Sequence, residues 1–128
     1  MRKQISSGTT WEETVGYSRA VRVDNTIEIS GTTAMDGNLL IGKNDVYQQA
    51  IFIFKKIEKS LIELGGRLSD VVRTRMFVTD ISDWETIGKA HGEFFRDIKP
   101  VTSMVEVKGL INSDLLIEVE VTAIIQQS

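Results

Sequence analysis

The spacing of apolar residues changes between two periods along this chain, and this change constrains the fold most. Apolar side chains recur at helical spacing over residues 44–64 and again from Ser82 to before Pro100. The other regular segments alternate with a period of two, which is typical of strands. They cover residues 17–23, 26–30, 35–42, 71–79, 102–107 and 115–125. This order predicts a two-layer α+β sandwich, with a mainly antiparallel six-stranded sheet and two helices on one face.

The ends of the two helices carry their own signals. Asn44 or Asp45 can cap the first helix, and the Gly65-Gly66 pair can end it. In the second helix, Ser82 is followed three residues later by Glu85, the spacing of a capping box. We therefore expect this helix to begin at Ser82.

Composition and charge exclude several classes of protein. We expect one domain over residues 1–128, because the chain contains no repeat and no linker-like stretch. A net charge of −3 argues against general nucleic-acid binding. The chain has no cysteine and a single histidine, so we expect no disulfide and no metal site. It has neither a long apolar run nor a signal-peptide pattern, so we expect no membrane contact and a cytoplasmic location.

The last predicted strand has one fully apolar face and one mixed face. The apolar face suits contact with the helices. The other face is apolar at its ends and acidic in the middle, and it carries Leu116, Glu118, Glu120, Thr122 and Ile124. A face of this kind is more typical of contact with other subunits than of full exposure to water. We therefore expect an oligomer.

Charged residues on the predicted sheet are the first candidates for chemistry. Glu118 and Glu120 share a face at a spacing of about 7 Å, where enclosed carboxylates can transfer protons. A solvated or ion-paired strand surface explains the same pattern. Arg73 and Arg75 also alternate together, and an arginine there can clamp a substrate carboxylate. More often such an arginine pairs with an acidic residue on the next strand, for which Glu118 and Glu120 are the candidates, and we favour this structural interpretation.

Small polar residues at strand ends are the second set of candidates. Thr102 and Ser103 follow Pro100 at the start of a strand, because proline cannot donate a ladder hydrogen bond. Ser30 and Gly31 end another strand, where a backbone without a side chain permits close approach of a ligand. An ordinary strand end accounts for either pair.

Two further residues have a structural and a functional interpretation. His91 lies on the apolar stripe of the second helix, which is typical of a core-edge histidine with one hydrogen bond and less typical of a catalytic one. Trp11 and Glu12 precede the first predicted strand, where they can line a pocket or fix the N-terminal segment. No Ser/His/Asp arrangement and no phosphate-binding loop is present.

Taken together, these segments resemble the RidA/YjgF family over about residues 11–126, with the same element order. The segments are "VGYSRAVRVDNTIEISGTTA", "DVVRTRMFVTDISDWETI", "EFFRDIKPVTSMVEV" and "LLIEVEVTAI". The resemblance implies a chorismate-mutase-like fold and a homotrimer with ligand clefts between adjacent subunits. It also implies hydrolysis of enamine or imine metabolites to a 2-oxo acid and ammonia, without a metal or cofactor.

The resemblance also assigns site residues by position. The cleft tyrosine falls on Tyr17, the serine-glycine pair on Ser30 and Gly31, and the catalytic glutamate on Glu118. The backbone near Met104 would help to hold the substrate.

One position departs from the family pattern. Thr102 stands where the family has the arginine that clamps the substrate carboxylate, and Ser103 follows it as in the family. Three functions follow as hypotheses. The first is a deaminase with an altered substrate, either uncharged at that end or held by Arg19 or Arg75. The second is a non-catalytic trimer that binds small metabolites, and the third and most distant is a ribonuclease, which the acidic composition disfavours.

Overall fold

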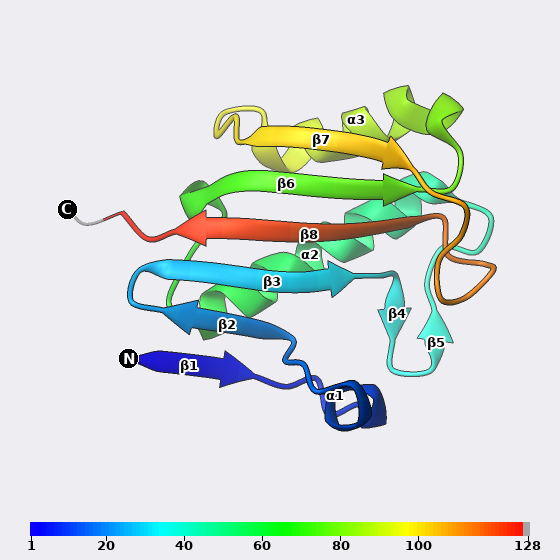
Figure 1. The fold of residues 1–128 in the computed structure, drawn as a ribbon. Helices are drawn as coiled ribbons and strands as arrows, with labels where there is room; N and C mark the ends of the chain where they lie inside the picture. Colours follow the sequence, from blue (N-terminus) through cyan, green and yellow to red (C-terminus); the bar gives the residue numbers. More distant parts are fainter. Residues whose placement is uncertain (127–128) are drawn as a thin grey trace.

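The predicted change of period is present in the structure, a computed structural model that describes residues 1–126 (Figure 1). The strands are β1 (Arg2–Ile5), β2 (Ala20–Val23), β3 (Thr26–Thr32), β4 (Met35–Asp36), β5 (Leu39–Leu40), β6 (Val71–Val78), β7 (Val101–Glu106) and β8 (Ile117–Ile124). The helices are α1 (Thr10–Val15), α2 (Val46–Glu63) and α3 (Trp84–Phe95), with short 3₁₀ turns η1 (Leu68–Asp70) and η2 (Ile81–Asp83).

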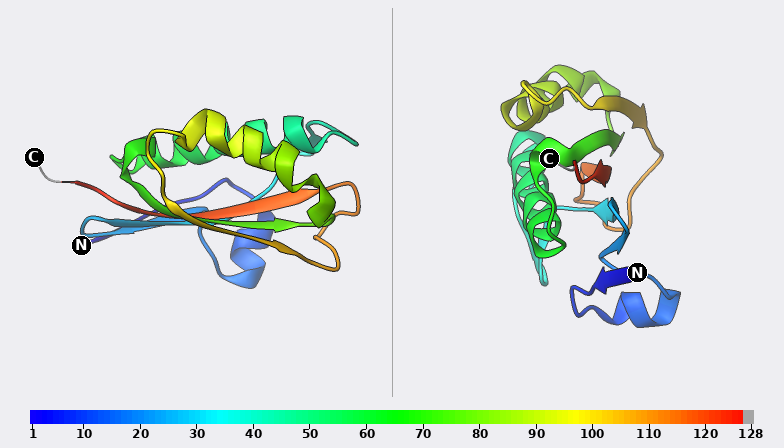
Figure 2. Two further views of the ribbon diagram at one scale, coloured as in Figure 1. Left: turned by 90° about the horizontal axis from the view of Figure 1, so that it is seen from above. Right: turned by 90° about the vertical axis from the view of Figure 1, so that its left-hand side faces the viewer.

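Six strands form one sheet in the order β1-β2-β3-β8-β6-β7. Every neighbouring pair is antiparallel except β6 and β7, which are parallel. Helices α2 and α3 cover one face of this sheet (Figure 2). The short helix α1 lies on the other side, at the β1 edge (Figure 2). The α+β class, the mainly antiparallel sheet and the two helices on one face are therefore confirmed.

The sixth strand of the sheet differs from the predicted one. It is β1, whereas the predicted segment 35–42 forms the separate two-stranded β4–β5 ladder. β1 reads Arg-Lys-Gln-Ile and lies mostly exposed at the sheet edge, so it has no hydrophobic alternation to reveal it. The six-residue helix α1 was not predicted either.

The helix ends bear out one capping prediction and correct another. Asp45 caps α2, because its carboxylate accepts a hydrogen bond from the backbone N–H of Gln48 at 3.0 Å. The capping box predicted for Ser82 is wrong. The backbone N–H and the hydroxyl of Ser82 both donate to the Asp80 carboxylate, at 3.0 and 2.6 Å. These bonds cap η2 and lower the pKa of Asp80, and α3 begins only after this turn, at Trp84.

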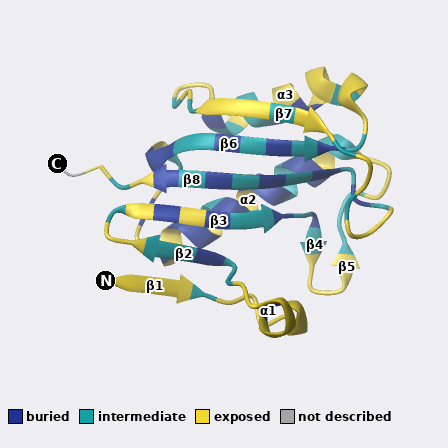
Figure 3. Cartoon of the chain, viewed as in Figure 1, coloured by how far each residue is buried: buried dark blue, intermediate teal, exposed yellow. Residues whose placement is uncertain are grey.

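The hydrophobic core lies between the helices and one face of the sheet (Figure 3). The inward residues of β8 are Ile117, Val119, Val121 and Ala123, each at most 1% exposed. The alternation predicted for this strand is therefore confirmed. One position on β6 breaks the alternation: Val71 is buried, whereas Arg73, two residues later, is not. A shift in the β6–β8 register between these two residues causes the difference.

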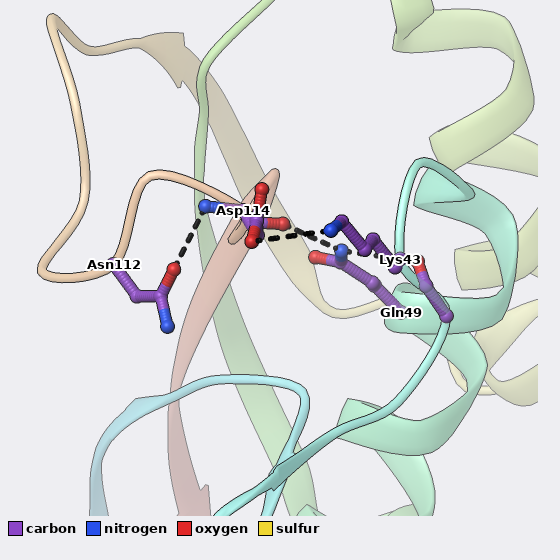
Figure 4. Close-up of polar contacts among 5 residues, drawn as sticks. Lys43, Gln49, Asn112 and Asp114 are labelled. Atoms are coloured by element: carbon purple, nitrogen blue, oxygen red, sulfur yellow. Dashed lines mark hydrogen bonds and ion pairs between the residues drawn. The ribbon is translucent and has the colours of Figure 1, made fainter.

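A buried glutamine fixes the start of β8 against α2. Gln49 is 0% exposed, and its Nε2 donates to the backbone carbonyls of Gly42 and Asp114 at 3.1 and 3.0 Å. Its Oε1 accepts from the N–H of Leu116 at 2.8 Å. Lys43 approaches the Asp114 carboxylate from the same side (Figure 4). The buried amide is thus fully used, and it sets where β8 begins relative to the helix layer.

Candidate functional site

The face of the sheet away from α2 and α3 contains a hollow of about 630 Å³. Residues of β1, β2, β3, β6 and β8 line it together with the loop that follows α1. Among the sequence-predicted site residues it brings together Tyr17, Ser30 and Arg75. Its polar lining includes Gln4, Glu12, Ser18, Glu28 and Glu120.

A β-bulge in β3 shapes one side of this region. Ile29 and Thr32 pair with β8 residues that are only two positions apart. Ser30 and Gly31 therefore both lie opposite Glu120, one residue more than a regular ladder allows. Such an extra residue disrupts the local ladder, and its carbonyl groups need other partners.

Arg19 supplies those partners. Its Nη2 donates to the carbonyls of Ser30 and Gly31 at 2.5 and 3.0 Å, and to Thr32 Oγ1 at 2.8 Å. Burial lowers the pKa of Arg19, although the nearby acidic groups, including Glu118, oppose this shift. Arg19, one of the two cations that the sequence offered as an alternative clamp for the substrate, therefore holds the bulge in this structure.

The carboxyl group of Glu118 lies against Gly31. A Cβ atom at position 31 would stand 2.8 Å from Glu118 Cδ and closer still to Oε2, so only glycine permits this placement. Glu118 is half-buried. Burial raises the pKa of its carboxyl group, repulsion from Glu120 raises it further, and Arg19 acts in the opposite direction. A carboxyl group with a raised pKa accepts and returns a proton more readily than an ordinary exposed carboxylate.

Glu120 has a different environment on the same strand face. Its Oε1 lies 3.5 Å from Nη1 of Arg75, directly across the β6–β8 ladder. The cross-strand pair that alternation predicted is therefore present. Both side chains remain more than a third exposed, so the pair contributes at most about 1 kcal/mol to stability.

Thr102 lies on the opposite side of the sheet from the hollow. It pairs with Thr74 across the parallel β6–β7 ladder, and the two Oγ1 atoms are 2.6 Å apart. Thr74 Oγ1 is also 2.9 Å from Nε2 of His91 on α3, which places both hydroxyls on the helix side. Met104 points the same way and packs against the core, whereas Ser103 is exposed and alternates to the other face.

Within one chain, these residues form two separate groups. β7 and β3 are separated by β6 and β8, so Thr102 lies about 14 Å from the strand that carries Ser30, at about 4.8 Å per strand. The two groups also face opposite sides of the sheet. A ligand contacting both Thr102 and Tyr17 therefore needs a second copy of the chain.

From the sequence, Glu12 can either line a pocket or fix the N-terminal segment, and in the structure it does both. It lines the hollow, and its carboxylate accepts hydrogen bonds from the N–H and hydroxyl of Ser7, so it also fixes the N-terminal segment. Burial would raise the pKa of Glu12, but hydrogen bonds from Ser7 and Ser6 and the charge of Arg19 outweigh it and lower the pKa. Its neighbour Trp11 is 57% exposed and does not line the hollow.

Two negative findings concern residues 1–126. In this range, no three histidine, aspartate or glutamate side chains lie close enough together to hold a metal ion. None of the helices described over the same range is both long enough and apolar enough to cross a bilayer.

Comparisons with known proteins agree with the fold. The family model described as "Endoribonuclease L-PSP" matches residues 9–125. A solved structure of a YjgF/YER057c/UK114 family member from Mycobacterium tuberculosis superposes with a TM-score of 0.89 at 43% identity, covering 98% of this chain and 100% of that one.

Two relatives carry names that state an activity. The 3-aminoacrylate deaminase RutC of Acinetobacter baylyi is 31% identical, over 80% of this chain and 82% of its own length. The human 2-iminobutanoate/2-iminopropanoate deaminase is 33% identical, over 84% of this chain and 79% of its own length.

The fold defines an α+β protein with a YjgF-like structure. The chain belongs to the RidA/YjgF family, which the "Endoribonuclease L-PSP" model describes and which includes enamine and imine deaminases.

Proposed function

We propose that this protein hydrolyses small reactive enamines or imines in a cleft between the subunits of a homotrimer. The observation that carries this proposal is the half-buried carboxyl group of Glu118 against Gly31, with its raised pKa. The names of two relatives, at 31% and 33% identity, support the reaction class.

Assembly is required because the two groups of site residues lie apart in one chain. In the proposed trimer, β7 of one subunit lies beside the hollow of its neighbour and brings Thr102 towards Tyr17 and Ser30. Exposed apolar residues on β7 support this arrangement: Val101 is 56% exposed and Val105 is 47% exposed. Burying both against a neighbour would add hydrophobic stabilisation to the assembly.

In the proposed reaction, Glu118 carries protons from oxygen to nitrogen. An enamine first becomes the imine by gaining a proton on carbon and losing one from nitrogen. Glu118 then accepts a proton from water as the water oxygen bonds to the C=N carbon, and it delivers that proton to nitrogen. The hydroxyl of the resulting carbinolamine passes its proton to the same nitrogen, again through Glu118, and the C–N bond breaks to leave a carbonyl group, so one water is consumed and one ammonia is released. A carboxyl group with a raised pKa suits both proton transfers.

The end of the substrate that meets Thr102 is proposed to be uncharged. A threonine hydroxyl offers one neutral hydrogen bond, whereas the arginine of the family pattern offers a charge-assisted bidentate pair. The two arginines that could replace the clamping arginine of the family pattern already have other partners. Arg19 holds the β3 bulge, and Arg75 is paired with Glu120.

The proposal is tested by generating 2-iminopropanoate and an uncharged imine in situ and measuring ammonia release. We expect acceleration over background with the uncharged imine, and loss of that acceleration in Glu118→Gln. Background rates with both proteins on every substrate, together with saturable binding of small carbonyl compounds, would instead indicate the non-catalytic metabolite-binding protein. Cleavage of single-stranded RNA would indicate the third function, and this activity is assayed in parallel.

A further inference from the structure

A short chain of hydrogen bonds links the helix layer to the exposed edge of the sheet. It runs from Nε2 of His91 to Oγ1 of Thr74 over 2.9 Å, and from there to Oγ1 of Thr102 over 2.6 Å. Thr74 is 0% exposed, whereas Thr102 is exposed on the edge strand β7. Thr102 is therefore the exposed end of the chain, and the position of its hydroxyl is set from inside the protein.

A continuous chain has two directions, because the buried Thr74 hydroxyl then donates its single hydrogen to one neighbour and accepts a hydrogen bond from the other. In one, Nε2–H of His91 donates to Thr74 and Thr74 donates to Thr102, which leaves the Thr102 hydrogen free to point outwards. In the other, Thr102 donates to Thr74 and Thr74 donates to an unprotonated Nε2, so Thr102 presents only lone pairs. The tautomer of His91 thus decides whether Thr102 acts as a donor or an acceptor.

The surroundings of His91 favour the uncharged imidazole. Its ring packs edge-on against Phe54 of α2, with centroids 5.7 Å apart, and at 4.7 Å against Phe95 of its own helix. Its Nε2 contacts the neutral hydroxyl of Thr74 on β6, which is in turn hydrogen-bonded to the neutral hydroxyl of Thr102 on β7. Burial alone lowers the pKa of His91. The chain therefore presents a neutral hydroxyl to a ligand.

We propose that His91, acting through Thr74, positions the Thr102 hydroxyl to bind a neutral group with donor and acceptor atoms, such as a carboxamide. This inference rests on the proposed function, since it names the substrate class of that site. Thr102 would contact the substrate, whereas Thr74 and His91 are positioning residues. A carboxamide suits this hydroxyl because its oxygen accepts and its nitrogen donates.

The experiment compares two substrates on matched variants. 2-Iminopropanamide is generated by base elimination of HCl from N-chloroalaninamide, and 2-iminopropanoate by amino-acid oxidase acting on alanine. Thr74→Val removes the central hydroxyl while keeping the shape of the side chain, and Thr74→Ser restores a hydroxyl. Thr26→Val makes the same chemical change at an exposed position of β3 outside the hollow. Thermal unfolding confirms that each variant is folded.

We expect wild type to favour the amide over the acid. Thr74→Val should raise KM for the amide about fivefold, the factor that corresponds to one neutral hydrogen bond, with little change in kcat. Thr74→Ser should retain the wild-type KM, and Thr26→Val should leave it unchanged. Equal KM values in Thr74→Val and wild type, or a preference for 2-iminopropanoate, would overturn the inference while leaving hydrolysis itself intact.

A binding readout separates this inference from the proposed reaction. Pyruvamide and pyruvate, the carbonyl products of the two imines, are titrated by NMR against the same variants. Tighter binding of pyruvamide that weakens in Thr74→Val and recovers in Thr74→Ser supports the inference even if no hydrolysis is detected. The inference is contradicted if the Thr74 substitutions leave the affinity for pyruvamide unchanged, or if pyruvamide binds more weakly than pyruvate.

Discussion

The β3 bulge and the start of β7 are the two halves of the candidate site. Charged side chains interact at the bulge, whereas neutral hydroxyls interact at the start of β7. At the bulge, Glu118, Gly31 and Arg19 are tightly coupled: the glycine admits the carboxyl group, and the arginine holds the bulged carbonyls. At the start of β7, the hydrogen-bonded pair Thr74 and Thr102 offers two neutral hydroxyls. In the proposed reaction, the first half keeps the proton-transfer group, while the second half decides the substrate.

The largest expected effect is the loss of kcat on substitution of Glu118. Comparing it with the same substitution at Glu120, on the same strand, tests whether the bulge gives Glu118 its catalytic role. Removing a general acid–base group typically costs about 10²–10⁴-fold in rate, so we expect Glu118→Gln to reduce kcat by at least about 10²-fold. Glu120→Gln is the comparison on the same strand face. It should cost less, because that carboxylate is paired with Arg75 and acts on Glu118 only through the repulsion that raises the Glu118 pKa. Steady-state ammonia release measures both. Equal losses in the two variants would remove the distinction between them.

The next largest effect should come from crowding the same carboxyl group. Gly31→Ala places a Cβ against Glu118, whose flexible side chain can move aside. Displacement of a catalytic group by about 1 Å can cost about 10²-fold, so we expect kcat to fall by about 10- to 100-fold with little loss of stability.

The control for this change is Gly88→Ala on α3, where an added Cβ meets nothing within 4 Å. In the Glu118→Gln background, Gly31→Ala should have no further effect on kcat. An additive loss in the double variant would mean that Gly31 acts independently of the carboxyl group.

A third prediction concerns the β7 half. Thr102→Arg places a cation at the start of this strand, and a charge-assisted hydrogen bond is worth about 1.5–3 kcal/mol. We expect kcat/KM for 2-iminopropanoate to rise about tenfold or more, while that for the uncharged imine falls. Thr102→Gln is the control of comparable polarity without charge. No change with either substrate would mean that β7 does not contact the substrate.

The smallest expected effect is on how the free energy of unfolding depends on pH. The pKa of Glu118 is raised above its ordinary value of 4.5, so the folded state binds its proton more tightly than the unfolded state does. Above pH 4.5, the ionised carboxyl group therefore reduces stability, and this loss grows until the pH passes the folded pKa. Glu118→Gln should be more stable than wild type at pH 7, and this difference should disappear below pH 4.5. Urea unfolding at several pH values measures it.

The sequence predicted the layers of the fold well, because period-two and helical spacing reflect which residues meet the core. β1 escaped prediction since its exposed residues carry no such pattern. The Ser82 cap was wrong because Asp80, only two residues away, competes for the same backbone N–H. Both errors arise where polar groups, and not burial, decide the local structure.

The site was less predictable than the fold. The Arg75–Glu120 pair followed from alternation, because both residues lie at the centres of regular strands. The role of Arg19 in holding the bulge did not follow from the sequence. It depends on a bulge that only the pairing of β3 with the distant β8 creates. The bond between Thr74 and Thr102 likewise depends on the parallel register of β6 and β7, which no local pattern encodes.

The central claim is that Glu118 and Thr102 act in one cleft but come from different subunits. It is tested most directly by refolding two inactive variants together, Glu118→Gln and a blocked Thr102→Trp. If the cleft is shared, random mixing of equal amounts restores both residues in about a quarter of the sites, and activity returns to about that fraction of wild type. If each site lies within one chain, the mixture stays as inactive as its components.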